Sequence, residues 1–247
     1  KSTGEPTYRL PDIAYHIDKV KRDFNLIVDI FGADHIDTYP DVLLALESLG
    51  HRVDHIKVVI HQFVTLKEDG KVVKMSTRKA NFVTLDELIE KLSADIIRYF
   101  FIMRGANSHL DFDLNLAMDE SEKNPVYYLQ YAHARISNLG KRFKKEVGET
   151  NKINLQLLDK EDEMSLMKKL SQFPKKMEQL HKSLEPRQLA TYLEELAAQY
   201  HKFYGNHKVI DLDNAELSHA RMALCDATQI IFKIGLSILG ITAPERM

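Results

Sequence analysis

A string of cations and hydroxyls around residue 75 has the composition of a phosphate-binding loop. The stretch "DGKVVKMSTRKANFVTLDELI" (69–89) places Lys71, Lys74, Arg78 and Lys79 within nine residues, with two hydroxyl side chains between the second and third of them. Ammonium, guanidinium and hydroxyl donors can converge on clustered negative charge, so the stretch suits a polyphosphate. A solvated hairpin tip is the alternative interpretation of the same residues.

A second polar stretch, "FGADHIDTYP" (31–40), follows a predicted strand and precedes a predicted helix. This order puts it at a carboxyl end of the sheet, where open α/β folds bind ligands. Gly32 lets the backbone approach a ligand closely, while Asp34 and His35 supply a carboxylate and an imidazole. Ordinary turn chemistry would explain the same residue types.

A third candidate site lies in "PTYRLPDIAYHIDK" (6–19), where Tyr8 and Asp12 are four residues apart. If a helix begins near Asp12, the tyrosine precedes it in a strand or turn. A carboxylate beside an aromatic hydroxyl can hold a guanidinium or ammonium group by charge-assisted hydrogen bonds. The alternative is an aspartate that caps the helix and a tyrosine that packs.

One face of a later predicted helix combines aromatic rings with positive charge. In "NPVYYLQYAHARISNLGKRFKK" (124–145), Tyr128, Tyr131 and Arg135 recur at i, i+3 and i+7, and four cations follow between residues 141 and 145. Aromatic rings stack on unpaired bases and arginine contacts phosphate, so this face suits a single-stranded RNA loop. Tyrosines at helical spacing can equally belong to a core.

The elements that must position these groups change character along the chain. Apolar, β-branched runs at 25–32 and 53–61 flank a helical stretch at 41–50, and this order predicts a parallel βαβ unit. Asp69–Gly70 predicts a hairpin, and the capping-box spacing that begins at Thr84 predicts a following helix.

From Asn124 onward the apolar spacing is helical and predicts a bundle of four or five helices, interrupted by a turn-rich break at 148–152. Asn124 can cap the first of these helices, with Pro125 at its first position. The chain is therefore predicted to be α/β followed by all-α, with one domain at 1–118 and a helical domain at 119–247.

Composition excludes several classes of protein. The formal net charge of −2 over 247 residues argues against a strongly basic nucleic-acid protein, so any RNA binding must use local patches. Cys225 is the single cysteine, which excludes an internal disulfide and a cysteine-based zinc site, and no histidine pair has a convincing metal-ligand spacing. No run reaches the roughly 18 apolar residues of a membrane span. We therefore expect a cytoplasmic protein without membrane contact or a metal site.

Together these stretches resemble arginyl-tRNA synthetase, a class I aminoacyl-tRNA synthetase. "KMSTR" (74–78) resembles the second class I signature, Lys-Met-Ser-Lys, and "FGADHIDTYP" resembles the family's Trp-Gly-Ala-Asp-His-His stretch. Residues 98–139 and the closing "LGITAPERM" are similar to the junction with the anticodon-binding domain and to the family's C-terminus. The resemblance implies the second half of a Rossmann-like catalytic domain followed by an α-helical anticodon-binding bundle.

The resemblance also implies a reaction, its partners and a role for each matched residue. The reaction is the ATP-dependent activation of arginine and its transfer to arginine tRNA, with Mg²⁺ accompanying ATP as substrate, no tightly bound cofactor, and a monomeric full enzyme. The implied roles are catalysis by Lys74, Met75, Ser76 and Arg78; arginine binding by Tyr8, Asp12, Asp34 and His35; ATP binding by Gly32, His35 and Lys74; and tRNA binding by Tyr128, Tyr131 and Met247, to which the helix face adds Arg135.

The sequence departs from the family pattern in two ways. Thr77 replaces the second lysine of the Lys-Met-Ser-Lys signature, and the first class I signature, His-Ile-Gly-His, occurs nowhere. We therefore expect a C-terminal portion of the enzyme that binds tRNA without catalysing the reaction alone. A non-catalytic RNA-binding paralogue is the alternative, whereas a cysteinyl-tRNA synthetase would need a zinc site built with cysteines.

Overall fold

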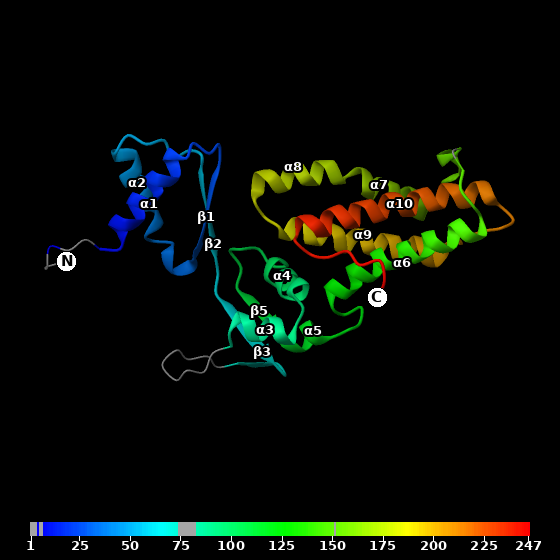
Figure 1. The fold of residues 1–247 in the computed structure, drawn as a ribbon, viewed down its shortest axis with the longest axis horizontal. Coiled ribbons are helices and arrows are strands. Elements are labelled where there is room, and N and C mark those ends of the chain that lie inside the picture. Colours follow the sequence, from blue (N-terminus) through cyan, green and yellow to red (C-terminus); the bar gives the residue numbers. More distant parts are fainter. Residues whose placement is uncertain (1–3, 5–6, 74–82, 151) are drawn as a thin grey trace. The chain divides into compact units, whose positions relative to one another are not determined.

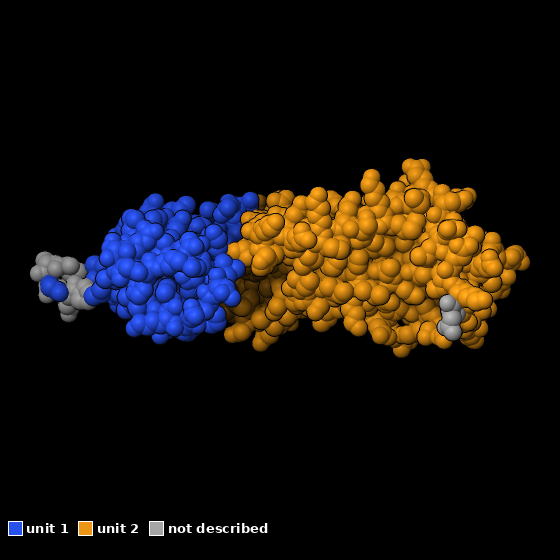
Figure 2. All heavy atoms as spheres, turned by 90° about the horizontal axis from the view of Figure 1, so that it is seen from above, with its two compact units in different colours: residues 1–65, 106–110 blue, residues 66–105, 111–247 orange. Residues whose placement is uncertain are grey.

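The computed structural model describes residue 4 and residues 7–73, 83–150 and 152–247. The predicted phosphate loop, Lys74 to Arg78, lies outside these residues. The chain divides into two compact units, residues 1–65 with 106–110 and residues 66–105 with 111–247 (Figure 2). A mixed α/β region precedes a helical bundle, which confirms the predicted fold class (Figure 1).

The first unit is built around the predicted βαβ arrangement. Helix α1 (Arg9–Lys21) precedes strand β1 (Ile27–Gly32), a 3-10 turn (Ala33–His35), helix α2 (Tyr39–Ser48) and strand β2 (Ile56–His61). The two strands pair in parallel with Ile27 opposite Ile56. Gly50 has a φ of +82°, the left-handed conformation that ends a helix at little steric cost, so the predicted glycine cap of α2 is confirmed.

Both helices of this unit pack on one face of the two-stranded sheet. Ile27 and Ile56 from the strands and Val42 and Leu46 from α2 are buried together, and apolar residues of α1 pack against them. Because successive strand residues point to opposite faces, Val28 is exposed on the other side. The helices therefore approach the sheet from one side only within the described residues.

A three-stranded sheet, most of whose residues belong to the second unit, is accompanied by short helices in the described residues. The strands β3 (Val64–Glu68), β4 (Lys71–Val72) and β5 (Leu110–Asp113) lie in the order β4-β3-β5. Asp69 and Gly70 both have positive φ, as a tight hairpin turn requires, so the predicted hairpin is confirmed. Helix α3 (Leu85–Lys91) starts with the predicted capping box between Thr84 and Glu87. Helices α4 (Ala94–Ile102) and α5 (Leu114–Met118) flank β5 along the chain.

In the described residues after 124, the bundle has five helices, in agreement with the prediction: α6 (Pro125–Glu146), α7 (Glu161–Ser171), α8 (Phe173–Ser183), α9 (Arg187–Asn206) and α10 (Ala215–Ile238) (Figure 1). Asn124 caps α6 as predicted, since its Oδ1 accepts a hydrogen bond from the Val126 amide at 3.0 Å. Gly235 lets α10 approach α9 closely, because a Cβ there would lie 2.7 Å from Cδ2 of Leu193. Over the ranges that the structure describes, none of these helices has the length and apolar character needed to cross a membrane.

Candidate functional site

The first unit gathers two of the predicted stretches at one end. Helix α1 and strand β1 are joined by only a few residues, so the start of α1 lies toward the carboxyl end of β1. An ion pair between Arg9 and Asp41 ties the start of α1 to the first turn of α2. Tyr8 and Asp12 therefore lie at the same end of the unit as Gly32, the last residue of β1.

The turn after β1 presents its polar groups to solvent. Both side chains of the Asp34–His35 pair are substantially exposed, with 3.8 Å between His35 Nε2 and Asp34 Oδ2. The His35 ring stacks on Phe31, with 5.4 Å between the ring centroids, which orients the imidazole. A Cβ at Gly32 would lie 2.6 Å from Asp34 Oδ1, so a side chain at residue 32 would displace this carboxylate.

Tyr8 and Asp12 lie on one face at the start of α1. Tyr8 is the N-cap residue, and the Asp12 amide donates a hydrogen bond to the Tyr8 carbonyl across one helical turn. The helix begins at Arg9, slightly earlier than predicted, so Asp12 lies in its first turn and is not the cap residue. The Tyr8 side chain is 67% exposed and Asp12 is partly exposed, so both can reach a ligand.

A buried polar chain behind Asp12 was not predicted from the sequence. His16 is 3% exposed and lies between two carboxylates, with 3.2 Å from its Nδ1 to Asp12 Oδ1 and 3.0 Å from its Nε2 to Asp29 Oδ2. Lys19 also bonds to Asp29. Two signals were available: His16 follows Asp12 by one helical turn, and Asp29 interrupts an apolar strand.

The described residues on either side of the predicted phosphate loop belong to a hairpin and to the start of a helix. On one side the Val73 amide donates to the Leu66 carbonyl at 2.9 Å, which continues the hairpin. On the other side, the capping box at Thr84 fixes the start of α3. Since Lys74, Met75, Ser76 and Arg78 lie outside the described residues, their roles stay predictions.

In the bundle, the predicted aromatic face of α6 surrounds a histidine of α9. The His201 ring lies 5.0 Å from the Tyr128 ring and 6.3 Å, nearly parallel, from the Tyr131 ring, measured between centroids. Burial, and secondly the charge of Arg135, lower the pKa of His201, which favours the neutral imidazole. Tyr128 is half-buried, whereas Tyr131 is 39% exposed. The face is therefore only partly core.

Arg135 extends this face as a cation between two rings. Its guanidinium carbon lies 4.3 Å from the centroid of the Tyr204 ring and 5.6 Å from that of Tyr131. These are cation–π distances, and they hold the planar guanidinium against rings that remain partly accessible. Tyr204 belongs to α9 and was not among the predicted residues, because only the packing of α9 against α6 brings it here.

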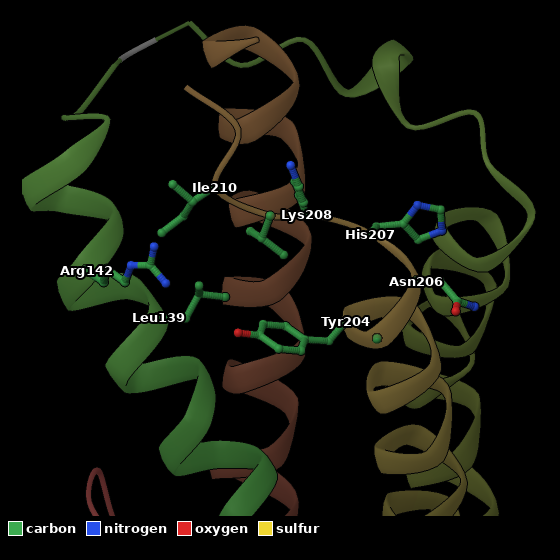
Figure 3. Close-up of a pocket in the computed structure, with 9 residues that line it drawn as sticks. Leu139, Arg142, Tyr204, Asn206, His207, Lys208 and Ile210 are labelled. Atoms are coloured by element: carbon green, nitrogen blue, oxygen red, sulfur yellow. The ribbon is translucent and has the colours of Figure 1, made fainter. Parts of the chain in front are cut away.

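A hollow of about 450 Å³ adjoins this face (Figure 3). Leu139 and Arg142 line it from α6, and the Tyr204 ring points toward them from α9. Lys208, in the segment after α9, adds an exposed ammonium group. Arg142 is paired with Glu146, with 2.7 Å between Nε and Oε1. A hollow with an aromatic wall and two cations can accept a base together with its phosphate.

Met247, the remaining predicted RNA contact, lies in the segment after α10 and lines a different hollow. Its side chain is 55% exposed and lines a second hollow together with Tyr127 and Gln130. Within the described parts of the chain, no three histidine, cysteine, aspartate or glutamate side chains are grouped so that they could hold a metal ion.

Comparison with known families divides the chain in two. Residues 25–126 match the model for class I tRNA synthetases of the methionine group, and residues 129–247 match that for the DALR anticodon-binding domain. The second match covers the bundle with Tyr131, Arg135 and Tyr204.

Individual relatives agree with these matches. Proteins named arginine–tRNA ligase from Desulfotalea psychrophila and Salinibacter ruber are 52% and 50% identical over the whole of this chain, which covers 45% and 44% of their lengths. A solved structure from Campylobacter jejuni, assigned as an arginyl-tRNA synthetase, superimposes on the whole chain with a TM-score of 0.87 at 31% identity, over 54% of its own length. The chain spans about half the length of the relatives that it matches. Over its whole length, the chain is similar to part of an arginine–tRNA ligase, and its second half matches the DALR anticodon-binding domain.

Proposed function

We propose that this chain works in ATP-dependent arginine–tRNA ligation in the cytoplasm, and that its helical domain binds the anticodon loop of arginine tRNA. The observation that carries the proposal is the identity of about half of all residues to arginine–tRNA ligases over the complete chain. The aromatic and cationic face of the bundle supports it, because such a face suits unpaired bases. We place the domain boundary at 118/119, between the α/β region and the bundle.

For the amino acid, the proposed contacts are the two exposed groups at the start of α1. Asp12 can accept hydrogen bonds from the guanidinium of arginine, and the Tyr8 hydroxyl can bind beside it. Asp34 and His35 would contribute from the carboxyl end of β1 at the same end of the unit. A carboxylate that faces a guanidinium rejects a neutral side chain of the same shape, because its buried charge would then be unpaired.

For ATP, the proposed contacts are Gly32, His35 and the loop with Lys74, Met75, Ser76 and Arg78. In activation, an oxygen of the arginine carboxylate attacks the α-phosphorus and pyrophosphate leaves with the electron pair of the broken P–O bond. Cations of the loop would stabilise the charge that grows on pyrophosphate, with Mg²⁺ accompanying ATP. A terminal hydroxyl of the tRNA then attacks the carbonyl carbon and AMP leaves. We expect the ligase to act as a monomer.

The chain's own part of this function can be tested by titrating it against arginine tRNA at one fixed salt concentration. We expect saturable binding that Tyr131→Ala weakens about fivefold or more, since stacking on one ring is worth about 1–3 kcal/mol. Tyr15→Ala is the matched control, because Tyr15 is also exposed but lies on α1. Equal weakening by both variants, or no binding, would refute the proposal.

Non-catalytic RNA binding is the second candidate, because the chain covers less than half of the length of its ligase relatives. Arginine-dependent exchange of pyrophosphate into ATP, measured with arginine tRNA present, separates the two. A signal that Asp12→Asn abolishes supports the ligase site, whereas tRNA binding without any exchange shows that the chain by itself binds RNA without catalysing the reaction, as the sequence predicts.

A further inference from the structure

The last residues of the chain turn back onto the helical unit and are held there. Gly240 has a φ of +69° directly after α10, and a Cβ on it would collide with the guanidinium of Arg98. The next residue, Ile241, is buried, and its amide donates to the Leu236 carbonyl at 2.9 Å. The C-terminal tail, which we define as residues 242–247, then runs back beside α6 (Figure 1).

Asp95 and Gln130 hold the start of this tail. Asp95, in the first turn of α4, accepts hydrogen bonds at one carboxylate oxygen from the Thr242 amide at 3.2 Å and also from the Thr242 hydroxyl. Gln130 Nε2, on α6, donates to the same oxygen at 2.9 Å and to the Thr242 carbonyl at 3.0 Å. Both polar groups of the Thr242 backbone are therefore satisfied by side chains of two different helices.

His133 and Lys141 hold the rest of the tail. His133 is 3% exposed, and its Nδ1 lies 2.8 Å from the Pro244 carbonyl, which can only accept, so this nitrogen carries the proton. The next residue, Glu245, pairs with Lys141 at 3.1 Å, and this hydrogen-bonded pair lowers the pKa of Glu245. The attachment thus extends to two residues before the end of the chain.

The hydrogen bonds that hold the tail do not serve to bury Met247, because its side chain stays exposed. Holding a segment that forms no helix or strand in one conformation costs conformational entropy. Here the bonds end at an exposed methionine, whose side chain lines a hollow of about 370 Å³ with Tyr127 and Met118. A polarisable thioether beside an aromatic ring is an adaptable surface for a flat ligand.

We propose that Asp95, Gln130 and His133 are positioning residues that hold the C-terminal tail so that Met247 contacts the anticodon loop. The inference rests on the proposed tRNA binding of this chain and adds the residues that fix one of its contacts. None of the three needs to touch RNA, because each acts through the tail.

A double-mutant cycle tests this with the chain as it exists. We titrate arginine tRNA, at one fixed salt concentration, against three variants: Met247→Ala, Gln130→Leu and the double variant. The matched control is Gln179→Leu, which changes an exposed site on α8. We expect Met247→Ala and Gln130→Leu each to weaken binding about fivefold, and the double variant to bind no more weakly than either single variant. Gln179→Leu should bind like the parent chain.

Each other outcome has a definite meaning. If the parent chain fails to bind tRNA, the proposed function fails, and the tail inference fails with it. If the parent binds but the two losses multiply, or Met247→Ala has no effect, the tail inference alone is overturned. Thr242→Val, which removes one exposed hydroxyl, gives the same cycle if Gln130→Leu fails to fold, as judged by circular dichroism.

Discussion

Replacing Arg135 by methionine should change both the stability of the bundle and the salt dependence of the RNA binding that we propose for it. The guanidinium lies 4.3 Å from the Tyr204 ring centroid, well inside the roughly 6 Å range of cation–π attraction, whereas the 5.6 Å to Tyr131 is near its limit. One good contact at a partly exposed site is worth about 0.5–1 kcal/mol. We therefore expect Arg135→Met to lower the free energy of unfolding by about 1 kcal/mol, measured in urea.

The same variant should lose one phosphate contact. Each phosphate that a protein neutralises on a single strand contributes about 0.7 to the slope of log K against log salt. Titrations at several salt concentrations should therefore give a slope that is shallower by about 0.7 for Arg135→Met. Arg135→Lys is the control, since it keeps the charge, and its slope should match that of the parent chain.

A third effect of Arg135→Met, a change in the pKa of His201, can be measured without RNA. Because the charge of Arg135 is the second cause, after burial, of the lowered pKa of His201, its removal should raise this pKa while leaving it below the ordinary value. A proton NMR titration of the histidines measures the shift. An unchanged salt slope together with an unchanged His201 pKa would refute the assignment of Arg135 to this face.

Three further predictions concern buried polar groups. The pKa of His201 is lowered in the folded state, so the imidazole of the unfolded chain takes up its proton at a higher pH. The free energy of unfolding should therefore fall as the pH decreases below about 6.5. Urea titrations should show that His201→Phe removes this part of the pH dependence. Arg221→Met should cost about 3–5 kcal/mol in urea unfolding, since the fully buried Glu163 loses its guanidinium partner, and adding Glu163→Leu should recover much of the loss. Asp29→Leu should destabilise the first unit by about 1–3 kcal/mol, because His16 loses an acceptor, and hydrogen exchange should show faster opening of α1 with the bundle unchanged.

Features set by local chemistry could be predicted from the sequence. Asp69 and Gly70 define their turn through positive φ values, and Thr84 and Asn124 cap helices through bonds to residues two or three positions away. Strand β2 begins three residues later than predicted, at Ile56, because the segment from Val53 first forms a turn whose 2.9 Å bond joins the Ile56 amide to the Val53 carbonyl.

Features set by packing between distant segments could not be predicted in the same way. Asp29 pairs with His16 only because α1 lies against β1, and Tyr204 meets Arg135 only because α9 lies against α6. The choice between core and surface for Tyr131 likewise depends on how much of its ring His201 covers. Residue types and spacing indicated the aromatic face of α6, whereas the residues that α9 adds to this face could be identified only in the structure.

We propose that the bundle reads an arginine anticodon, and the ratio of two dissociation constants tests this most directly. One is for arginine tRNA and the other for the same tRNA with its central anticodon base changed, both at the same salt concentration. A wrong base at a read position costs about 1–3 kcal/mol, so we predict binding weaker by a factor of about 5 to 150. Equal dissociation constants for the two tRNAs would contradict the account.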